Sequence, residues 1–130
     1  MADLLGVSRS TYAGWENEID SVPLIKLNRF ANHFDICLDY LCGLTKTMRY
    51  NTYNKNINPK VLGDKLRFIR KQNNDTQKVI SSILSTDQSN YSRYELGKNI
   101  ILTDMIIGFA KHYKVSIDWL CDKTTTTSIH

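Results

Sequence analysis

Apolar residues recur at helical spacing along most of this 130-residue chain. In the second half, residues 60–72 place apolar side chains on one face, and polar residues that can cap helices precede the later apolar groups. Five helices are predicted there: 60–72, one after an N-cap at Thr76, one from a cap at Thr86 or Asp87 to about Leu96, about 103–113, and a short one from Ser116. Gly97 is suited to end the third, because the residue after a helix usually needs a positive φ. The pattern predicts an all-α fold.

The chain also contains a repeat. A shift of 79 positions aligns residues 1–46 with 80–125 without a gap and with eleven identities. Average residue usage predicts about three identities by chance, so we interpret the repeat as an internal duplication of a small module. The identical pairs are Leu5/Leu84, Ser10/Ser89, Tyr12/Tyr91, Glu16/Glu95, Phe30/Phe109, Ala31/Ala110, His33/His112, Asp39/Asp118, Leu41/Leu120, Cys42/Cys121 and Thr45/Thr124. Each copy is expected to have its own core.

The repeat predicts two tandem units of four to five short helices each. We place a truncated unit at 1–46, a polar linker at 47–58, a complete five-helix unit at 59–124 and a tail at 125–130. Helices of the first copy are expected at 1–5, 9–17, 23–34 and 37–43, and its helix 1 would lie before Met1. Without that helix, the apolar side chains of the first copy (Leu4, Leu5, Tyr12 and Trp15) would be left uncovered. Three explanations stay open: Thr47–Tyr53 folds over these side chains, a second chain covers them in a homodimer, or the chain begins downstream of its true start.

The segment STDQSNYSRYELG, residues 85–97, carries the candidate chemistry. Helical spacing puts Tyr91, Tyr94 and Glu95 on one side. The opposite side carries Gln88, Ser89, Ser92 and Arg93. An amide and a guanidinium can make bidentate hydrogen bonds to adenine and guanine edges, and the three-residue turn Ser85–Asp87 would join this helix to the one before it. The pattern therefore predicts a helix-turn-helix with a free polar face.

At these residues the chain resembles the phage repressor and Cro-type (XRE-like) helix-turn-helix family. The matching stretches are TQKVISSILSTDQSNYSRYELGK and KVSIDWL in the second copy, and LLGVSRSTYAGWEN and DICLDYL in the first. The resemblance implies base contacts from Gln88, Ser89 and Arg93, a contact from Gln77 at the start of helix 2, and a phosphate contact from Lys98. It also implies an internal structural pair between Arg70 and Glu95.

The corresponding face of the first copy would consist of Arg9, Ser10 and Thr11, with Gly14 in place of Arg93. A glycine within a helix costs about 1 kcal/mol relative to alanine and offers no side chain to DNA. We therefore expect the second copy to make the main contacts with DNA bases.

Charge and composition narrow the function. The net charge is +4, but residues 1–46 carry four basic and six acidic side chains, whereas residues 47–79 carry eight basic and two acidic ones. The basic segment suits a polyanion. No apolar run is long enough to cross a membrane, and the three cysteines are expected to be thiols in a cytoplasmic protein. His33 and His112 are interpreted as structural, and we expect no metal, because no paired Cys-x-x-Cys element accompanies them. We also expect no cofactor and no enzymatic activity, because no phosphate-binding glycine loop, nucleophile elbow or clustered carboxylate motif occurs.

The leading hypothesis is a sequence-specific double-stranded DNA-binding protein that inserts a helix into the major groove, a transcriptional repressor of phage, mobile-element or bacterial type. Such repressors usually read palindromes, with half-sites about 34 Å apart. The alternative is a protein-binding helix-turn-helix module, an antitoxin or a phage-encoded inhibitor of host defence, whose acidic first unit contacts a basic protein partner.

Overall fold

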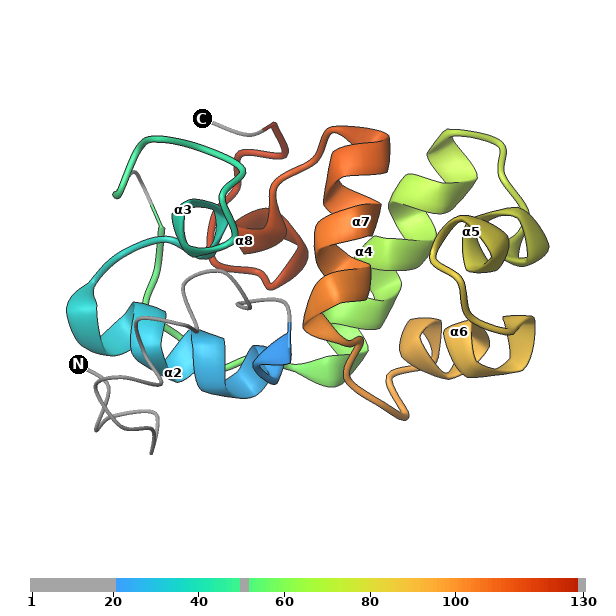
Figure 1. Ribbon diagram of the computed structural model, residues 1–130, viewed down its shortest axis with the longest axis horizontal. Helices are drawn as coiled ribbons and strands as arrows, with labels where there is room; N and C mark the ends of the chain where they lie inside the picture. Colours follow the sequence, from blue (N-terminus) through green and yellow to red (C-terminus); the bar gives the residue numbers. More distant parts are fainter. Residues whose placement is uncertain (1–20, 50–51, 129–130) are drawn as a thin grey trace.

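The computed structural model describes residues 21–49 and 52–128, which form helices and loops without a strand (Figure 1). The helices are α2 (Leu24–Phe34), α3 (Leu38–Leu41), α4 (Pro59–Gln72), α5 (Gln77–Ile83), α6 (Gln88–Glu95), α7 (Thr103–Tyr113) and α8 (Ile117–Leu120). The all-α prediction is confirmed. The helices expected at 1–5 and 9–17, with the candidate residues Arg9, Ser10 and Thr11, lie outside the described residues.

Side-chain caps begin four helices of the second half, three of them at the residues predicted from the sequence, Thr76, Asp87 and Ser116, and one at Asn58. The side chains of Asn58, Thr76, Asp87 and Ser116 accept hydrogen bonds from the first backbone amides of α4, α5, α6 and α8. Gly97 follows α6 with φ +75°, as the C-terminal signal predicts. Polar side-chain caps thus begin α4, α5, α6 and α8, whereas α7 begins after Leu102 without one.

The described part of the first half has the same helix bounds as the second half at the 79-residue offset. α2 corresponds to α7, and α3 corresponds to α8, residue for residue. Their ends correspond too, because Asp35 and Lys114 both have the left-handed backbone, with φ 58° and φ 57°. The two helix pairs therefore share one backbone design.

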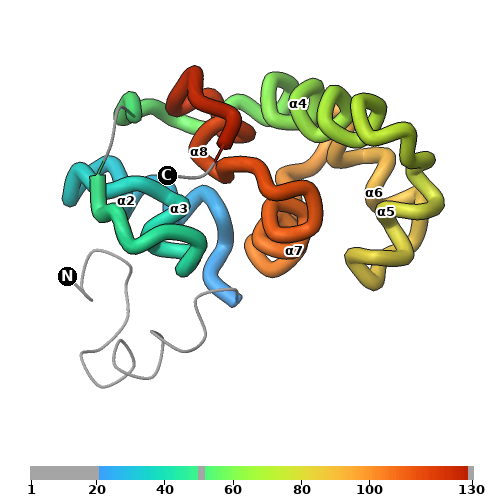
Figure 2. Tube along the Cα trace, turned by 90° about the horizontal axis from the view of Figure 1, so that it is seen from above, coloured from blue at the N-terminus to red at the C-terminus, as the bar shows by residue number. Residues whose placement is uncertain are grey.

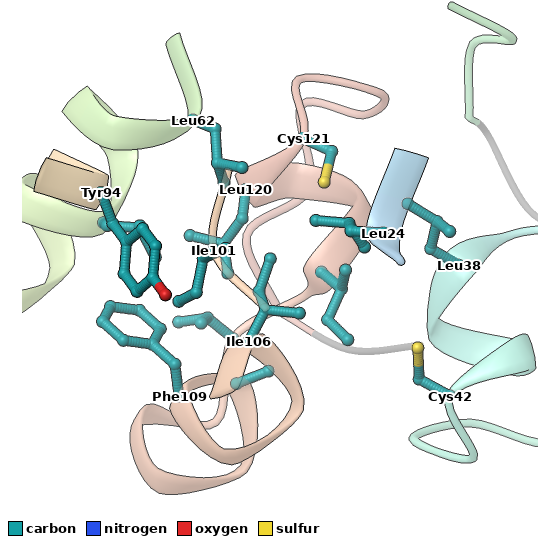
Figure 3. Packing of buried hydrophobic residues seen from close by; sticks show 14 of the residues in the cluster. Leu24, Leu38, Cys42, Leu62, Tyr94, Ile101, Ile106, Phe109, Leu120 and Cys121 are labelled. Atoms are coloured by element: carbon teal, nitrogen blue, oxygen red, sulfur yellow. The ribbon is translucent and has the colours of Figure 1, made fainter. Parts of the chain in front are cut away.

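The apolar residues of both halves form one continuous core (Figure 3). Leu24, Leu38 and Cys42 of the first half belong to the same buried cluster as Leu62 and Phe109 of the second. The expectation of a separate core for each copy is wrong, because α3 packs directly on α8 and joins the two groups. Figure 2 shows α2 and α3 gathered at one end of the molecule, away from α5 and α6.

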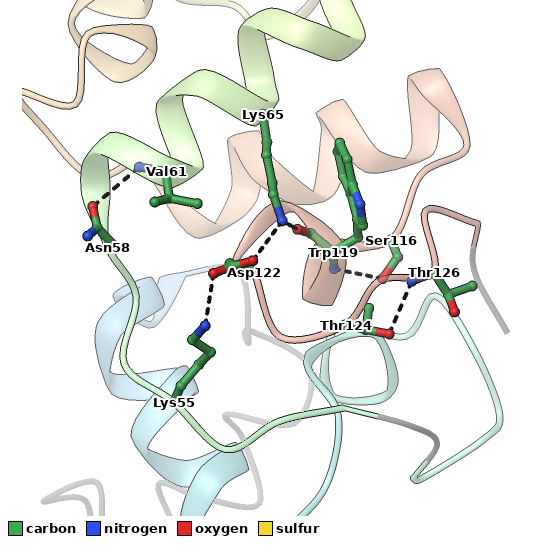
Figure 4. Close-up of polar contacts among 9 residues, drawn as sticks. All are labelled: Lys55, Asn58, Val61, Lys65, Ser116, Trp119, Asp122, Thr124 and Thr126. Atoms are coloured by element: carbon green, nitrogen blue, oxygen red, sulfur yellow. Dashed lines mark hydrogen bonds and ion pairs between the residues drawn. The ribbon is translucent and has the colours of Figure 1, made fainter.

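Residues 52–58, called the strap below, run between the two halves and contact both (Figure 4). The amide of Tyr53 donates to the carbonyl of Lys123, and the carbonyl of Lys55 accepts from the side chain of Asn28 at 2.8 Å. The Lys55 Nζ lies 2.8 Å from an oxygen of Asp122, which also pairs with Lys65. The strap therefore ties α2 to the segment that follows α8.

None of the described helices has the length and apolar character needed to cross a membrane.

Candidate nucleic-acid interface

The helices α5 and α6 and the turn between them are held by local hydrogen bonds. Thr76 Oγ1 accepts from the amide of Val79, and Asp87 Oδ1 accepts from the amide of Asn90 at 2.6 Å. Ser85 has φ 58°, which reverses the chain within the turn. A short turn between two capped helices fixes the direction of α6 relative to α5.

The side of α6 predicted to pack is buried. Tyr91, Tyr94 and Glu95 are 0%, 5% and 4% exposed. On the opposite side Gln88, Ser89 and Arg93 are exposed. The helix therefore uses its aromatic side as an anchor and leaves an amide, a hydroxyl and a guanidinium facing outward.

A buried ion pair fastens α6 to α4. Arg70 Nε and Nη2 donate to the two oxygens of Glu95 at 2.6 and 2.9 Å, and Arg70 Nη1 donates to the carbonyl of Asp75 at 2.9 Å. Two parallel N–H to O bonds make this a bidentate contact, which fixes orientation as well as distance. The structure thus contains the pair that the family resemblance implies.

Gln77 joins this pair to the surface. Its Nε2 donates to Glu95 Oε1 at 3.1 Å. Burial acts to raise the pKa of Glu95, but the hydrogen bonds from Arg70 and Gln77 outweigh it and lower the pKa below the ordinary value. Glu95 is consequently held as a carboxylate, and its charge orients Gln77 at the start of α5.

The candidate contact residues share one surface depression of about 550 Å³. It is lined by Gln77, Gln88, Ser89, Ser92, Arg93, Leu96 and Lys98. All five contact residues predicted in the second half, from Gln77 to Lys98, are therefore brought together, although they come from α5, from α6 and from the segment after it. Polar side chains and two cations around an open concave surface suit an extended anionic ligand better than an enclosed small molecule.

Two lining residues, Ser92 and Leu96, were not assigned as site residues from the sequence. Ser92 was placed on the free face, and Leu96 follows it by four residues, the spacing that puts two helical side chains on one side. Leu96 is 52% exposed. This spacing was the signal that could have found Leu96.

Backbone packing fixes the height of α6 over α4. A Cβ at Gly63 would lie 2.5 Å from the carbonyl oxygens of Tyr94 and Glu95. Only glycine permits so close an approach of α4 to the end of α6. The position of the contact surface therefore depends on a residue that does not touch it.

Not every apolar residue of α5 packs inward. Ile80 is 0% exposed and Leu84 9%, whereas Val79 and Ile83 are each 44% exposed. The seven-residue helix has one packed face, and Val79 and Ile83 each lie about 100° around it from their buried neighbours.

The other candidate side chains remain outside this surface. His33 and His112 are exposed and lie edge-on to Phe34 and Tyr113, and the three cysteines are buried free thiols. Within the described ranges, no group of three metal-binding side chains is assembled.

Two capped helices, a four-residue connection and an exposed polar face on the second helix define a helix-turn-helix. Residues 63–125 match a family model described as "Helix-turn-helix domain". A curated relative, the "Uncharacterized HTH-type transcriptional regulator YobD" of Bacillus subtilis (strain 168), is 40% identical over 45 residues. The match covers 35% of this chain and 40% of that relative. No solved structure matches the chain significantly.

Proposed function

We propose that this protein is a sequence-specific double-stranded DNA-binding regulator of transcription that acts as a repressor. The observation that carries the proposal is the shared depression, in which Gln88, Ser89 and Arg93 are exposed together. The similarity to a relative named as a transcriptional regulator supports the same function.

In this mechanism α6 enters the major groove with its aromatic side anchored on α4. A groove about 12 Å wide admits one helix, and the Gln88 amide and the Arg93 guanidinium would bind adenine and guanine edges. Lys98 and the second N–H of Gln77 Nε2 would contact phosphates on either side. Occupation of a promoter by the bound protein would then block transcription.

We further propose that the chain consists of two tandem units, with the second as the main reader. The equal helix bounds of α2 and α7 and of α3 and α8 at the 79-residue offset support this organisation. The base-contact roles of Arg9, Ser10 and Thr11 in the first unit stay a prediction.

The test is a double replacement, Gln88→Ala with Arg93→Ala, after a cognate duplex has been selected from a random pool. Each bidentate base contact contributes about 1–3 kcal/mol of discrimination, so the variant should lose roughly tenfold or more of its preference for the cognate site. Salt-sensitive background binding should largely remain, because it comes from phosphate contacts. Lys111→Ala, which removes an exposed cation from the last turn of α7, is the control and should keep the preference. Unchanged discrimination in the double variant would refute the assignment.

Salt dependence separates this proposal from the protein-binding alternative. Several phosphate contacts should make the affinity for duplex DNA fall steeply with ionic strength, with a logarithmic slope of about −0.9 per contact. If no duplex is bound even in low salt, the DNA-binding proposal fails and the alternative, an antitoxin or an inhibitor of host defence, is favoured.

A further inference from the structure

The short helices α3 and α8 exchange hydrogen bonds in a reciprocal pattern. The amides of Leu38 and Asp39 donate to the two oxygens of Asp118, each at 2.9 Å. In return, the amide of Ile117 donates to Asp39 Oδ1 at 2.6 Å. Each aspartate therefore caps the first turn of the other helix, besides the local caps at Cys37 and Ser116.

This reciprocity is the contact pattern of a twofold dimer. Asp39 and Asp118 are equivalent residues at the 79-residue offset, and so are Leu38 and Ile117. In an isologous interface, if residue i of one copy contacts residue j of the other, then j of the first contacts i of the second. The α3–α8 contact obeys this rule within a single chain. Figures 1 and 2 both show the two helices side by side.

The interface is not symmetric away from the two aspartates. Lys123 is 1% exposed, and its Nζ donates to Asn28 Oδ1 at 2.7 Å. At the same offset the counterparts of these residues are Leu44 and Ile107, both partly buried against the apolar core. A twofold pairing of two α8 surfaces would place Lys123 opposite Ile107, where a buried ammonium has no acceptor. The polar pair therefore favours the first unit as the partner of α8 over a second copy of the second unit.

The strap reinforces this choice, because it bonds to both partners of the polar pair. The Lys55 carbonyl accepts from Asn28 Nδ2, and the Tyr53 amide donates to the Lys123 carbonyl. The chain that connects the units thus runs directly over the asymmetric end of their interface.

We propose that α3 and α8 form an intrachain dimer interface, in which the first unit occupies the position that a second chain would take, so that the protein is a monomeric pseudo-dimer. The occupant of the α8 surface is the segment from α2 to α3 of the same chain. If the proposed DNA-binding function also holds, one chain occupies one DNA site.

The first experiment measures the mass of the full chain by sedimentation equilibrium over a wide range of concentration. A monomer of 15.0 kDa is expected throughout. A stable dimer at concentrations used for binding would overturn the proposal.

The second experiment tests the crosswise capping by amide hydrogen exchange. Asp39→Ala should speed exchange at the amide of Ile117, and Asp118→Ala should speed exchange at Leu38 and Asp39. Asp104→Ala, an exposed carboxylate in the first turn of α7, is the control and should change none of these amides. Exchange altered only in the helix that carries the replaced residue would contradict reciprocal pairing. If either variant fails to fold, the mass of the wild-type chain still decides.

The stoichiometry on DNA separates a failure of this inference from a failure of the proposed function. One chain per selected duplex is expected. Two chains on one duplex would overturn the pseudo-dimer and leave DNA binding intact, whereas absence of duplex binding would overturn the proposed function and leave the monomer decided by its mass.

Discussion

Replacing Asp118 by asparagine should remove a dependence of stability on pH that the wild-type chain has near neutrality. The Asp118 side chain is 0% exposed. Burial, and after it the charge of Asp39, raise the pKa of the Asp118 carboxyl to about 7, although the amides of Leu38 and Asp39 act in the opposite direction. In the unfolded chain an aspartate has a pKa of about 3.9.

The sign of the effect follows from this difference. Between the unfolded and the folded pKa, the folded chain binds a proton that the unfolded chain does not, so the free energy of unfolding decreases as the pH rises through this window. Above about pH 7 the penalty is complete. For a folded pKa near 7, going from about pH 8 to about pH 6 should increase the free energy of unfolding by about 1.4 kcal/mol.

The other ionisable groups near Asp118 would not produce the same decrease in the free energy of unfolding with rising pH. Besides Asp39, whose charge contributes to the shift of Asp118, they are Lys123, Cys37, Cys42 and Cys121. Burial raises the pKa of the three thiols, to about 11 for Cys37 and about 12 for Cys42, so they stay protonated over this range. Burial lowers the pKa of Lys123, and its deprotonation in the folded state would make stability rise with pH, the opposite sign.

The assay is urea unfolding of the wild type, Asp118→Asn and Asp104→Asn at about pH 6 and pH 8. The wild type and Asp104→Asn should be more stable at the lower pH, and Asp118→Asn should lose most of that difference. Histidine contributions cancel when the variants are compared. A wild type that is equally stable at both values, or an Asp118→Asn variant with the full dependence, would refute the reasoning.

Two further predictions concern the attachment of α6 to α4. Arg70→Ala should lower the free energy of unfolding by about 3–5 kcal/mol, measured by thermal or urea unfolding, because it leaves the buried Glu95 carboxylate with Gln77 as its remaining side-chain donor. Arg70→Met combined with Glu95→Leu should recover most of this loss. An Arg70→Ala variant as stable as the wild type would contradict the role of the pair. Gly63→Ala should cost about 1–3 kcal/mol, because its Cβ would meet two backbone oxygens at 2.5 Å. The matched control Gly108→Ala should be near neutral, since its Cβ would lie 3.2 Å from the flexible end of Leu84, and equal losses in the two glycine variants would count against the close approach of α4 and α6.

The helices of the second half could be predicted closely because their signals are local. Thr76 and Asp87 each bond to an amide three residues away, and Gly97 ends α6 through its own backbone angle. The packed and free sides of α6 followed from helical spacing, since Tyr91, Tyr94 and Glu95 are buried as predicted. Such features need no knowledge of the rest of the fold.

What the sequence did not reveal depends on contacts between distant residues. The equivalence of Asp39 and Asp118 was visible in the repeat, but nothing local indicates that each caps the helix of the other across 78 to 80 positions. The repeat alone predicted one core for each copy. The packing of α3 on α8, which the repeat does not indicate, joins the two groups of apolar residues into one core. The hydrogen bond from Gln77 to Glu95 was not predicted for a similar reason. It joins the first residue of α5 to the last residue of α6, which are 18 positions apart in the sequence.

The second half of the chain presents two surfaces that do not compete for the same residues. Its α8 is occupied by α3, at the end of the molecule that also holds α2, whereas α5 and α6 lie at the other end (Figure 1). The residues lining the depression all lie from Gln77 to Lys98, and none belongs to α8 or to the described part of the first half. Pairing through α8 therefore leaves α6 open, and the bidentate Arg70–Glu95 contact holds α6 on α4 independently of that pairing. Replacements at Asp39 or Asp118 should consequently disturb the packing of α3 on α8 before they disturb the exposure of Gln88 and Arg93.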